Sequence, residues 1–254
     1  MMHLNRIFTG MCLAIALTLG STQAAQFDHT HARLAKVLKT NVKDGWVNYR
    51  TLKSKPIQLQ AYLRELAVVK ESQFNRWSKN EQLAFLYNLY NAATLQLILE
   101  NYPVASIKKI GGFFSGPWKQ KVVKLFGETT TLDHLEHGII RKNYRDARAH
   151  FALVCAAKSC PPLRSEAYVA SRLSEQLNDQ GRIFLGQNAK NRLDAPAGRV
   201  YLSPIFKWFD EDFERQSGSV LKFVQPFFPK SQQAAFSRSL SIKYTDYDWS
   251  LNER

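Results

Sequence analysis

Cysteine is scarce in this chain, which has 254 residues and only three cysteines. Cys12 lies in the N-terminal segment, and only Cys155 and Cys160 follow it. The chain after that segment can therefore form at most one internal disulfide. Internal repeats and low-complexity linkers are also lacking, and the remaining length of about 230 residues suffices for one sizeable core.

Long apolar runs are lacking except at the N-terminus. Arg6 precedes an apolar stretch over residues 7–19, and the small residues of 21–24 follow it. This order is typical of a secretory signal peptide, and the stretch is too short for a retained membrane helix. We therefore expect cleavage after Ala24 and a single domain over residues 25–254. The mature protein is expected to be periplasmic or secreted, with no transmembrane segment.

Acidic residues are few, with 21 Asp and Glu against 35 Lys and Arg. Removing residues 1–24 takes away Arg6 and no acid, which leaves a net charge of +13. A basic exported protein can meet an anionic lipid surface, an anionic polymer or an acidic protein partner. Nucleic acid is not expected as a partner, because that compartment offers little of it. The alternative is that the charge serves only solubility.

Hydrophobic periodicity predicts a long central helix over residues 81–100. Ser78 and Glu81 form a capping-box pattern at its start. The helix is apolar nearly all round, so we expect it to be buried. Asn88 and Asn91 then lie in or beside the core, where each amide needs partners. They either bridge backbone groups of neighbouring segments or orient a catalytic group.

Shorter elements complete a mostly helical α+β fold with a small, largely antiparallel sheet. Strands are expected over 46–49, over 118–126 as a hairpin or edge strand, and as a pair over 192–194 and 199–202. Further helices are predicted over 27–40, 57–69, 130–141, 165–185, 206–213, 220–228 and 232–240.

Reactive side chains are concentrated between Arg148 and Leu163. The pattern predicts a short apolar strand over residues 151–156, entered by His150 and followed by a loop that ends at Pro161. A nucleophile site, a metal site and a disulfide all fit this segment.

In a nucleophile site, a histidine activates a cysteine thiol and a carboxylate or amide orients that histidine. A helix predicted to start just after Cys160 would favour its thiolate. We expect the candidate residues to converge in one cleft. They are Cys160 and Cys155 as thiols, His150 and His137 as bases, and Glu136, Asn88 and Asn91 as orienting groups.

A metal site would use His134 and His137, which a helix places on adjacent turns. Cys155, Cys160 or His150 would complete it, but no fourth ligand is obvious. The alternative is that His137 bonds Asp133 or Glu136 within the core, and we assign neither a metal nor a cofactor. His29 and His31 are expected to be solvated and without a role.

A disulfide between Cys155 and Cys160 is the third alternative, because cysteines in an oxidising compartment usually pair. An extended strand would separate their Cα atoms by roughly 16 Å, at ~3.3 Å per residue, which is too far for a bridge. The bridge therefore requires a turn within residues 156–159. It would remove the simplest nucleophile mechanism unless the bridge is redox-active.

Several stretches, in order along the chain, resemble the domain-of-unknown-function 547 family, DUF547. Phe85-Leu86 departs from the aromatic pair with Trp expected there, and Leu135 stands where Ile is usual. The resemblance implies an exported bacterial domain, with kinship to papain-like or transglutaminase-like cysteine hydrolases, but no assigned function. The matching stretches are Phe85-Leu-Tyr-Asn-Leu-Tyr-Asn-Ala92, Tyr102-Pro103 with Ser106-Ile107-Lys108, Leu132-Asp-His-Leu-Glu-His-Gly-Ile-Ile-Arg141, His150-Phe-Ala-Leu-Val-Cys155, Ser159-Cys-Pro-Pro-Leu-Arg164 and Tyr247-Asp-Trp-Ser-Leu-Asn252.

The sequence thus favours a cysteine-dependent hydrolase or acyl transferase acting on an amide-type cell-envelope substrate. The alternative is a non-catalytic binding module for an anionic envelope component or a protein partner, with structural cysteines. Its expected contact surface is basic and aromatic. The residues of that surface are Trp118, Lys119, Lys121, Arg141 and Arg145.

Overall fold

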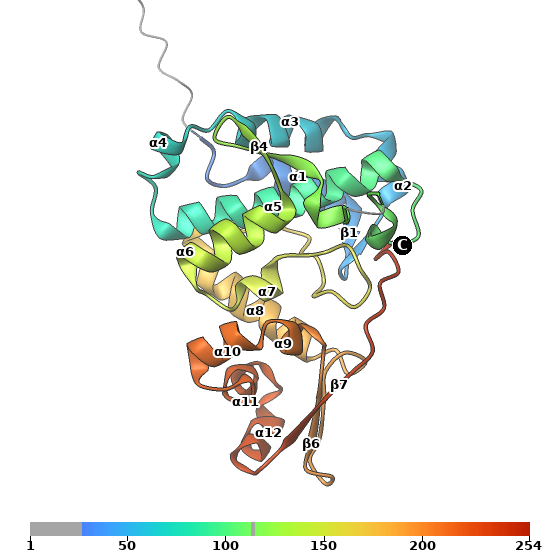
Figure 1. Cartoon of the computed structure of the whole chain (residues 1–254), viewed down its shortest axis with the longest axis vertical. Helices are drawn as coiled ribbons and strands as arrows, with labels where there is room; N and C mark the ends of the chain where they lie inside the picture. The colour runs from blue at the N-terminus through green and yellow to red at the C-terminus, as the bar shows by residue number, and fades with distance from the viewer. Residues whose placement is uncertain (1–26, 113–114) are drawn as a thin grey trace, which may run out of the picture.

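The computed structural model describes residues 27–112 and 115–254. The expected signal peptide and its cleavage site lie outside the described residues. The fold is a mostly helical α+β fold, as the sequence predicts. In the orientation of Figure 1, an upper part surrounds helix α5 and a lower part contains the last helices and the largest of the three sheets.

Helix α5 (Lys79–Asn101) is the buried centre of the upper part. Ser78 accepts a hydrogen bond from the backbone N–H of Glu81, and the Glu81 carboxylate accepts one from the backbone N–H of Ser78, so the predicted capping box is confirmed. Nearly every side chain from Leu83 to Leu99 is buried, because the helix is apolar on all faces. Around it lie α1 (Ala32–Asn41), α2 (Tyr49–Ser54), α3 (Ile57–Ala67) and α4 (Glu71–Phe74).

The middle of the chain packs along α5 and leads into the lower part. Here β3 (Lys121–Leu125) and β4 (Glu128–Thr131) pair in antiparallel register. They form a hairpin, which is one of the two predicted alternatives, the other being an edge strand. The elements in order are η1 (Ile107–Lys109), η2 (Pro117–Lys119), β3 (Lys121–Leu125), β4 (Glu128–Thr131), the π-helix η3 (His134–Arg141), α6 (Lys142–Tyr144) and α7 (Ala149–Ala152).

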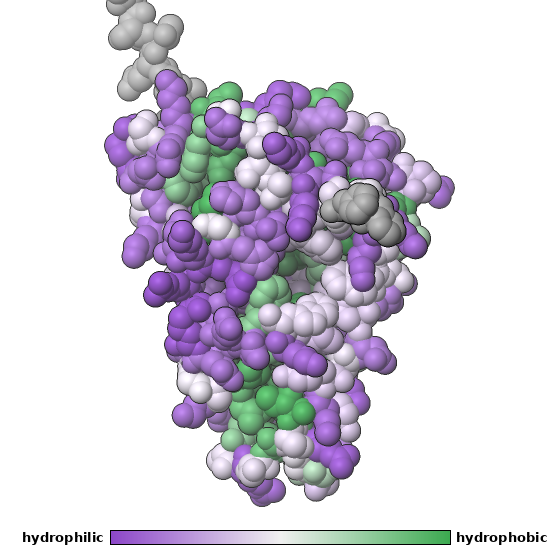
Figure 2. All heavy atoms as spheres, viewed as in Figure 1, coloured by the Kyte–Doolittle hydropathy of each residue, from purple (hydrophilic) through white to green (hydrophobic). Residues whose placement is uncertain are grey.

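The lower part has its own phenylalanine-rich core, which includes Phe151, Phe184, Phe206, Phe213 and Phe223. On the face shown in Figure 2, hydrophilic residues cover most of the upper part, whereas apolar residues reach the surface in the lower part. The elements are η4 (Ala170–Arg172), α8 (Leu173–Leu185), β5 (Arg192–Asp194), β6 (Arg199–Leu202), α9 (Ile205–Trp208), α10 (Asp210–Ser217), α11 (Val220–Val224), η5 (Gln225–Phe227), α12 (Lys230–Gln233), η6 (Ala234–Ser237) and β7 (Ser241–Tyr244).

The sheets are small and mostly antiparallel. The predicted strand pair is present as β5 and β6, in antiparallel register. Strand β7 adds to β6 in parallel, and a separate two-stranded pair joins β1 (Val42–Lys43) to β2 (Trp46–Val47). Within the described ranges, no helix is long and apolar enough to span a bilayer.

The C-terminal segment connects the two parts. After β7 it runs back along the molecule to the upper part (Figure 1). There the backbone N–H of Val47 donates to the carbonyl of Asn252, and the N–H of Leu251 donates to the carbonyl of Ala105, both at 2.9 Å. The hydroxyl of Tyr49 also donates to the Asn252 side chain at 2.7 Å. These bonds fix residues 247–252 beside the middle of the chain.

The strand expected over 46–49 ends at Val47, because Tyr49 begins α2. Three further local predictions, around the cysteine segment, are wrong. Residues 149–152 form α7 rather than entering a strand, and the chain then turns at Ala156, which has a φ of 59°. The helix expected over residues 130–141 starts later, because 128–131 pair as β4 and the Thr131 hydroxyl accepts the N–H of His134. The helix expected from residue 165 begins only at α8, after the turn η4.

Candidate functional site

A cavity of about 400 Å³ lies where the upper and lower parts meet. Because its walls come from elements far apart in the sequence, it exists only in the folded chain. Its lining combines six aromatic residues with several titratable side chains. The residues are Tyr90, Gly116, Trp118, Lys119, Asp133, Glu136, His137, His150, Leu153, Cys155, Cys160, Ile205, Trp208, Phe209, Tyr247 and Trp249.

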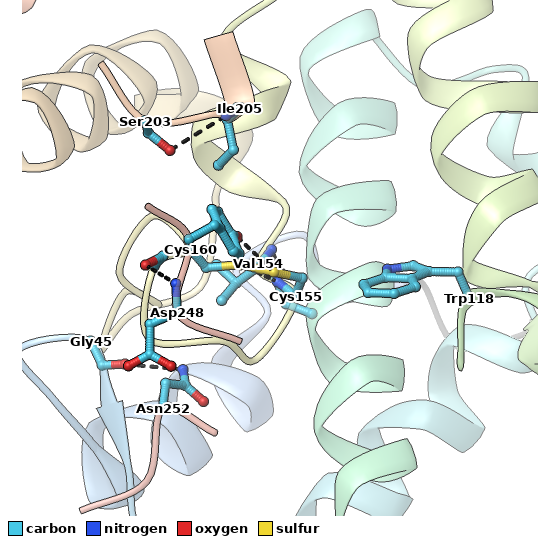
Figure 3. Close-up of a disulfide and its surroundings, with 12 residues drawn as sticks. Gly45, Trp118, Val154, Cys155, Cys160, Ser203, Ile205, Asp248 and Asn252 are labelled. Carbon is cyan, nitrogen blue, oxygen red and sulfur yellow. Dashed lines mark hydrogen bonds between the residues drawn. A yellow bond between two sulfur atoms is a disulfide. The ribbon is translucent and has the colours of Figure 1, made fainter. Parts of the chain in front are cut away.

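Cys155 and Cys160 are joined by a disulfide that forms part of the cavity wall (Figure 3). Their Cα atoms lie 6.2 Å apart. The left-handed conformation of Ala156 reverses the chain and brings the cysteines together. Of the three alternatives for this segment, the structure therefore contains the disulfide. In this form neither sulfur is a free nucleophile.

Both sulfurs of the disulfide are hydrogen-bonded. The backbone N–H of Cys155 donates to Sγ of Cys160 at 3.0 Å. The hydroxyl of Tyr247 lies 3.2 Å from each sulfur. Cys160 is only 3 % exposed, whereas Cys155 is half-buried. The bridge thus presents Cys155 rather than Cys160 to an approaching reagent.

The loop closed by the disulfide is held by the C-terminal segment. Ser250 accepts the backbone N–H of Lys158 at 2.8 Å, and Ala156 accepts the N–H of Asn252 at 3.0 Å. The Ser159 hydroxyl accepts the N–H of Asp248 at 2.8 Å. Hydrogen bonds from the C-terminal segment to three residues of the loop therefore fix the loop's backbone independently of the S–S bond.

Lys190, which does not line this cavity, supports the same loop. Its Nζ donates to the carbonyl of Cys160 at 2.7 Å. Burial lowers the pKa of Lys190 to about 8. A second hollow of about 280 Å³ includes both Lys190 and Cys160, so the loop around Cys160 separates two cavities.

His150 forms a buried pair with Asp212, which the sequence analysis did not single out. Nε2 of His150 lies 2.7 Å from Oδ2 of Asp212, and the side chains are 2 % and 6 % exposed. The imidazole ring stacks on Phe209 with ring centroids 4.0 Å apart. Helix α7 carries the histidine and α10 the aspartate, so packing of α10 under α7 creates the pair.

Two arginines also bind Asp212. Nε of Arg141 lies 2.6 Å from Oδ2, and Arg215 donates to Oδ1. Burial alone would raise the pKa of the Asp212 carboxyl. The hydrogen bonds from His150 and the two arginines outweigh that effect and hold this pKa well below its ordinary value. The carboxylate is therefore ionised and fixes both position and orientation of the histidine ring.

Glu136 lies on another wall of the cavity and is 8 % exposed. The hydroxyl of Tyr90 donates to its Oε2 at 3.1 Å, and Nε1 of Trp118 donates to the Tyr90 hydroxyl at 3.2 Å. Burial, with a further contribution from the Glu136 charge, raises the pKa of Tyr90. Glu136 bonds to α5 in this way and does not pair with His150.

His137 is not in the core, contrary to one sequence-based alternative. Its side chain is 42 % exposed, and its Nε2 is 3.9 Å from Asp133. Its Nδ1 lies 2.5 Å from the guanidinium of Arg141. His137 thus reaches the cavity rim and borders the arginine that binds Asp212. In the described ranges, no group of three or more His, Cys, Asp and Glu side chains is placed to hold a metal ion.

The two asparagines of α5 bridge backbone groups, as one of the two alternatives predicts. Asn88 donates to the carbonyl of Tyr168 at 2.8 Å and accepts its N–H at 3.0 Å. Asn91 donates to the carbonyl of Ala152 at 2.9 Å and accepts the N–H of Val154 at 3.0 Å. Only Asn91 supports the chain between His150 and Cys155, and neither asparagine lines the cavity.

An aromatic cluster surrounds the cavity mouth. Trp208 and Trp249 stack with an interplanar angle of 19°. The ring centroid of Tyr247 lies 4.8 Å from that of Trp208 and 4.5 Å from that of Trp249. Trp118 meets Trp249 edge-on and points toward Cys155 (Figure 3). The sequence analysis used Trp118 but not the others, although the closing Tyr247-Asp248-Trp249 stretch carried part of the family resemblance.

The structure does not gather the predicted basic surface into one patch. Lys119 lines the cavity beside Trp118, whereas Lys121 is exposed on β3 outside it. Arg141 is bound to Asp212, and Arg145 is an exposed residue after α6. Only Trp118 and Lys119 of the five candidates border the cavity.

His31 is not solvated, contrary to expectation. It is 1 % exposed, and its Nδ1 lies 2.7 Å from the hydroxyl of Tyr62. Burial lowers the pKa of His31 to about 4. His29 is partly exposed and lies 3.8 Å from Glu81. Neither histidine lines the cavity.

Comparison with known families gives a match over the middle of the chain. The family model described as "Protein of unknown function, DUF547" matches residues 74–185. This segment runs from the end of α4 to the end of α8 and includes Glu136, His150 and both cysteines of the bridge. Asp212 and the aromatic residues of the C-terminal segment lie beyond it. Neither the curated proteins nor the solved structures gave a match.

Proposed function

Because residues 74–185 belong to the DUF547 family, whose function is unassigned, we propose a function from the chemistry of the site. The protein is a cysteine-dependent hydrolase or acyl transferase, active once the disulfide is reduced. One observation carries the proposal: the cysteine pair lines the same cavity as His150, which is bonded to the buried Asp212. A thiol, an imidazole and an orienting carboxylate are the parts that acyl transfer through a thioester requires.

Cys155 is the nucleophile in this mechanism. It is the more exposed of the two sulfurs and lines the cavity, whereas Cys160 is 3 % exposed. The helix N-terminus that the sequence analysis placed after Cys160 is absent from that position, because α8 starts at Leu173. Support for Cys160 from a helix dipole is therefore lost, and Cys160 serves as the partner that closes the bridge.

His150 is the general base. Its Nε2 is bound to Asp212, so Nδ1 is the ring nitrogen that this bond does not use. The Nδ1 atom therefore takes the thiol proton while the Cys155 sulfur bonds to the amide carbon of the substrate. The same proton then passes to the leaving amine as the C–N bond breaks. Water or an acceptor amine cleaves the resulting thioester and regenerates the thiol.

The substrate is an amide-type component of the cell envelope. The aromatic mouth can bind the flat amide and its apolar neighbours, and Lys119 beside it favours a substrate that carries a negative charge. The expected export and the basic composition support the same substrate class. Trp118, Trp208 and Trp249 hold the substrate in this proposal, and Cys155 and His150 act on it.

The test is an activity screen on the dithiol form of the mature protein. After reduction with dithiothreitol, amide, ester and thioester substrates are supplied, and the acyl-enzyme is sought by intact mass spectrometry. Cys155→Ser and His150→Gln should abolish turnover, whereas Cys160→Ser should remain active without reductant. Unchanged turnover in the reduced Cys155→Ser variant would refute the proposal.

A binding module is the second candidate, favoured by the disulfide itself, because the structure contains no free thiol among the described residues. In this case the aromatic mouth and Lys119 bind an anionic envelope polymer. Lys119→Gln should then weaken binding in a salt-dependent way, while Lys121→Gln, outside the cavity, should not. Cys155→Ser should spare binding here but abolish turnover in an enzyme.

A further inference from the structure

We propose that the Cys155–Cys160 bridge is a thiol–disulfide exchange centre rather than a structural cross-link. A thiol reductant attacks Sγ of Cys155, and Cys160 leaves as the thiolate. This activity goes beyond the proposed acyl transfer and does not require it. It also implies a partner of definite chemistry, namely a dithiol that enters the cavity.

Accessibility of one sulfur is the first observation behind this inference. Exchange needs a thiolate to approach one sulfur of the disulfide. Cys155 is half-buried and borders a cavity of about 400 Å³, whereas Cys160 is buried. A purely structural bridge gains nothing from lining a cavity. The asymmetry selects Cys155 as the sulfur that is attacked.

Stabilisation of the leaving sulfur is the second observation. Sγ of Cys160 accepts the backbone N–H of Cys155 at 3.0 Å and lies 3.2 Å from the Tyr247 hydroxyl. Hydrogen bonds to the charged form of a group favour that form. A thiol that is stabilised as its thiolate leaves faster in exchange. The two donors are already in place before the S–S bond breaks.

The backbone around the bridge is the third observation. Lys158, Ser159 and Ala156 are hydrogen-bonded to the C-terminal segment, and Lys190 donates to the carbonyl of Cys160. These bonds do not depend on the disulfide, so the loop keeps its position after reduction. The Cys160 thiolate therefore remains close to Cys155, and the bridge can form again.

The reaction balances with a dithiol as the named reductant. Its first thiolate bonds to Sγ of Cys155 while the S–S bond breaks, and the electron pair remains on Cys160. Its second thiolate then attacks the mixed disulfide and releases Cys155. The protein gains two electrons, and the dithiol becomes a disulfide.

Other titratable groups around the cavity are Tyr90, Lys119, Asp133, Glu136, His137 and His150.

The first experiment measures reduction of the native protein by dithiothreitol, followed by alkylation and mass spectrometry. We expect a rate within about tenfold of that for the chain unfolded in urea, because the Cys155 sulfur can be reached without unfolding. Reduction that occurs only at the global unfolding rate would show that the bridge is a structural cross-link, and would overturn the inference.

The second experiment tests the leaving group. Tyr247→Phe removes the hydroxyl near the sulfurs and should slow reduction about three- to tenfold. The matched control is Tyr244→Phe in the preceding strand, which leaves the sulfurs untouched and should keep the wild-type rate. Equal rates in wild type and Tyr247→Phe would contradict the role of this hydroxyl in exchange.

The third experiment uses oxidised glutathione on single-cysteine variants, so it does not depend on acyl transfer. Cys160→Ser leaves Cys155, which should form the mixed disulfide at least about tenfold faster than Cys160 does in Cys155→Ser. Circular dichroism of both variants confirms that they are folded. Equal or reversed rates would refute the assignment of Cys155 as the attacked sulfur.

The outcomes separate this inference from the proposed function. Rapid reduction of the native bridge, without turnover of any substrate by the dithiol form, would support the exchange centre and refute the acyl-transfer proposal. Turnover by Cys160→Ser, combined with a native bridge that resists dithiothreitol, would support the acyl-transfer proposal and refute the exchange centre.

Discussion

Nε2 of His150 lies 2.7 Å from Oδ2 of Asp212, although 62 residues separate them in the chain. The carboxylate is also bound by Arg141 and Arg215, so its charge is balanced in a buried position. The ring of His150 is fixed further by stacking on Phe209. In the proposed mechanism, this arrangement leaves Nδ1 as the ring nitrogen for proton transfer in the cavity that contains the cysteines.

Asp212→Asn should impair both catalysis and stability. Loss of the charge frees the histidine from its fixed orientation, and kcat/KM of the dithiol form should fall about 10³- to 10⁴-fold. The free energy of unfolding should fall by about 2–3 kcal/mol, because Arg141 and Arg215 lose a buried partner. Turnover assays and urea unfolding measure the two effects.

Glu211→Gln is the matched control for that substitution. Glu211 is exposed in the same first turn of α10. In Glu211→Gln, kcat/KM and the free energy of unfolding should therefore keep their wild-type values. Wild-type turnover in Asp212→Asn would show that the pair is only a structural contact.

Asn91→Ala and Asn88→Ala should cost similar stability but differ in activity. Each amide satisfies one backbone donor and one backbone acceptor in the core, so either loss should reduce the free energy of unfolding by about 2–4 kcal/mol. Only Asn91 holds the backbone between His150 and Cys155. Turnover per folded molecule should therefore fall in Asn91→Ala alone, and an equal fall in both variants would contradict this role.

Lys190 should make stability depend on pH at alkaline values. Burial lowers the pKa of Lys190 to about 8 in the folded protein, whereas in the unfolded chain it is about 10.4. Between these values the unfolded chain binds more protons, so stability should rise with pH. The rise, relative to Lys190→Met, should be about 3 kcal/mol from pH 7.5 to 10.5.

Urea unfolding of wild type, Lys190→Met and Lys190→Gln across this range measures the effect. Both variants lack the titrating charge, but glutamine retains an N–H donor for the carbonyl of Cys160. The plots of unfolding free energy against pH should be parallel for the two variants. A wild-type plot parallel to both would show that burial does not disfavour the charged form of Lys190.

Trp208→Ala should weaken substrate binding with little effect on stability. The side chain is 46 % exposed, stacks on Trp249 and lies in a tilted contact with Tyr247. KM should rise about tenfold with kcat nearly unchanged, because the ring holds the substrate without touching the reacting bond. Trp46→Ala, which removes a tryptophan that is 39 % exposed and does not line this cavity, is the control.

Local patterns were sufficient for several elements. The capping box at Ser78 and the apolar periodicity after it predicted α5, because helix starts and helical faces are written in neighbouring residues. The strand pair around residues 195–198 followed from a turn between two short apolar segments. Patterns were insufficient for residues 151–156, since a short apolar run fits a buried helix as well as a strand.

The sequence by itself determined the central helix, the mostly helical α+β class, the family match and the residue types available for chemistry. Tertiary structure decided which of those residues meet. The left-handed Ala156 closes the disulfide, and the packing of α10 under α7 brings Asp212 to His150. The return of the C-terminal segment places Tyr247 at the sulfurs. Such contacts depend on how distant elements pack, and no periodicity within a short window encodes them.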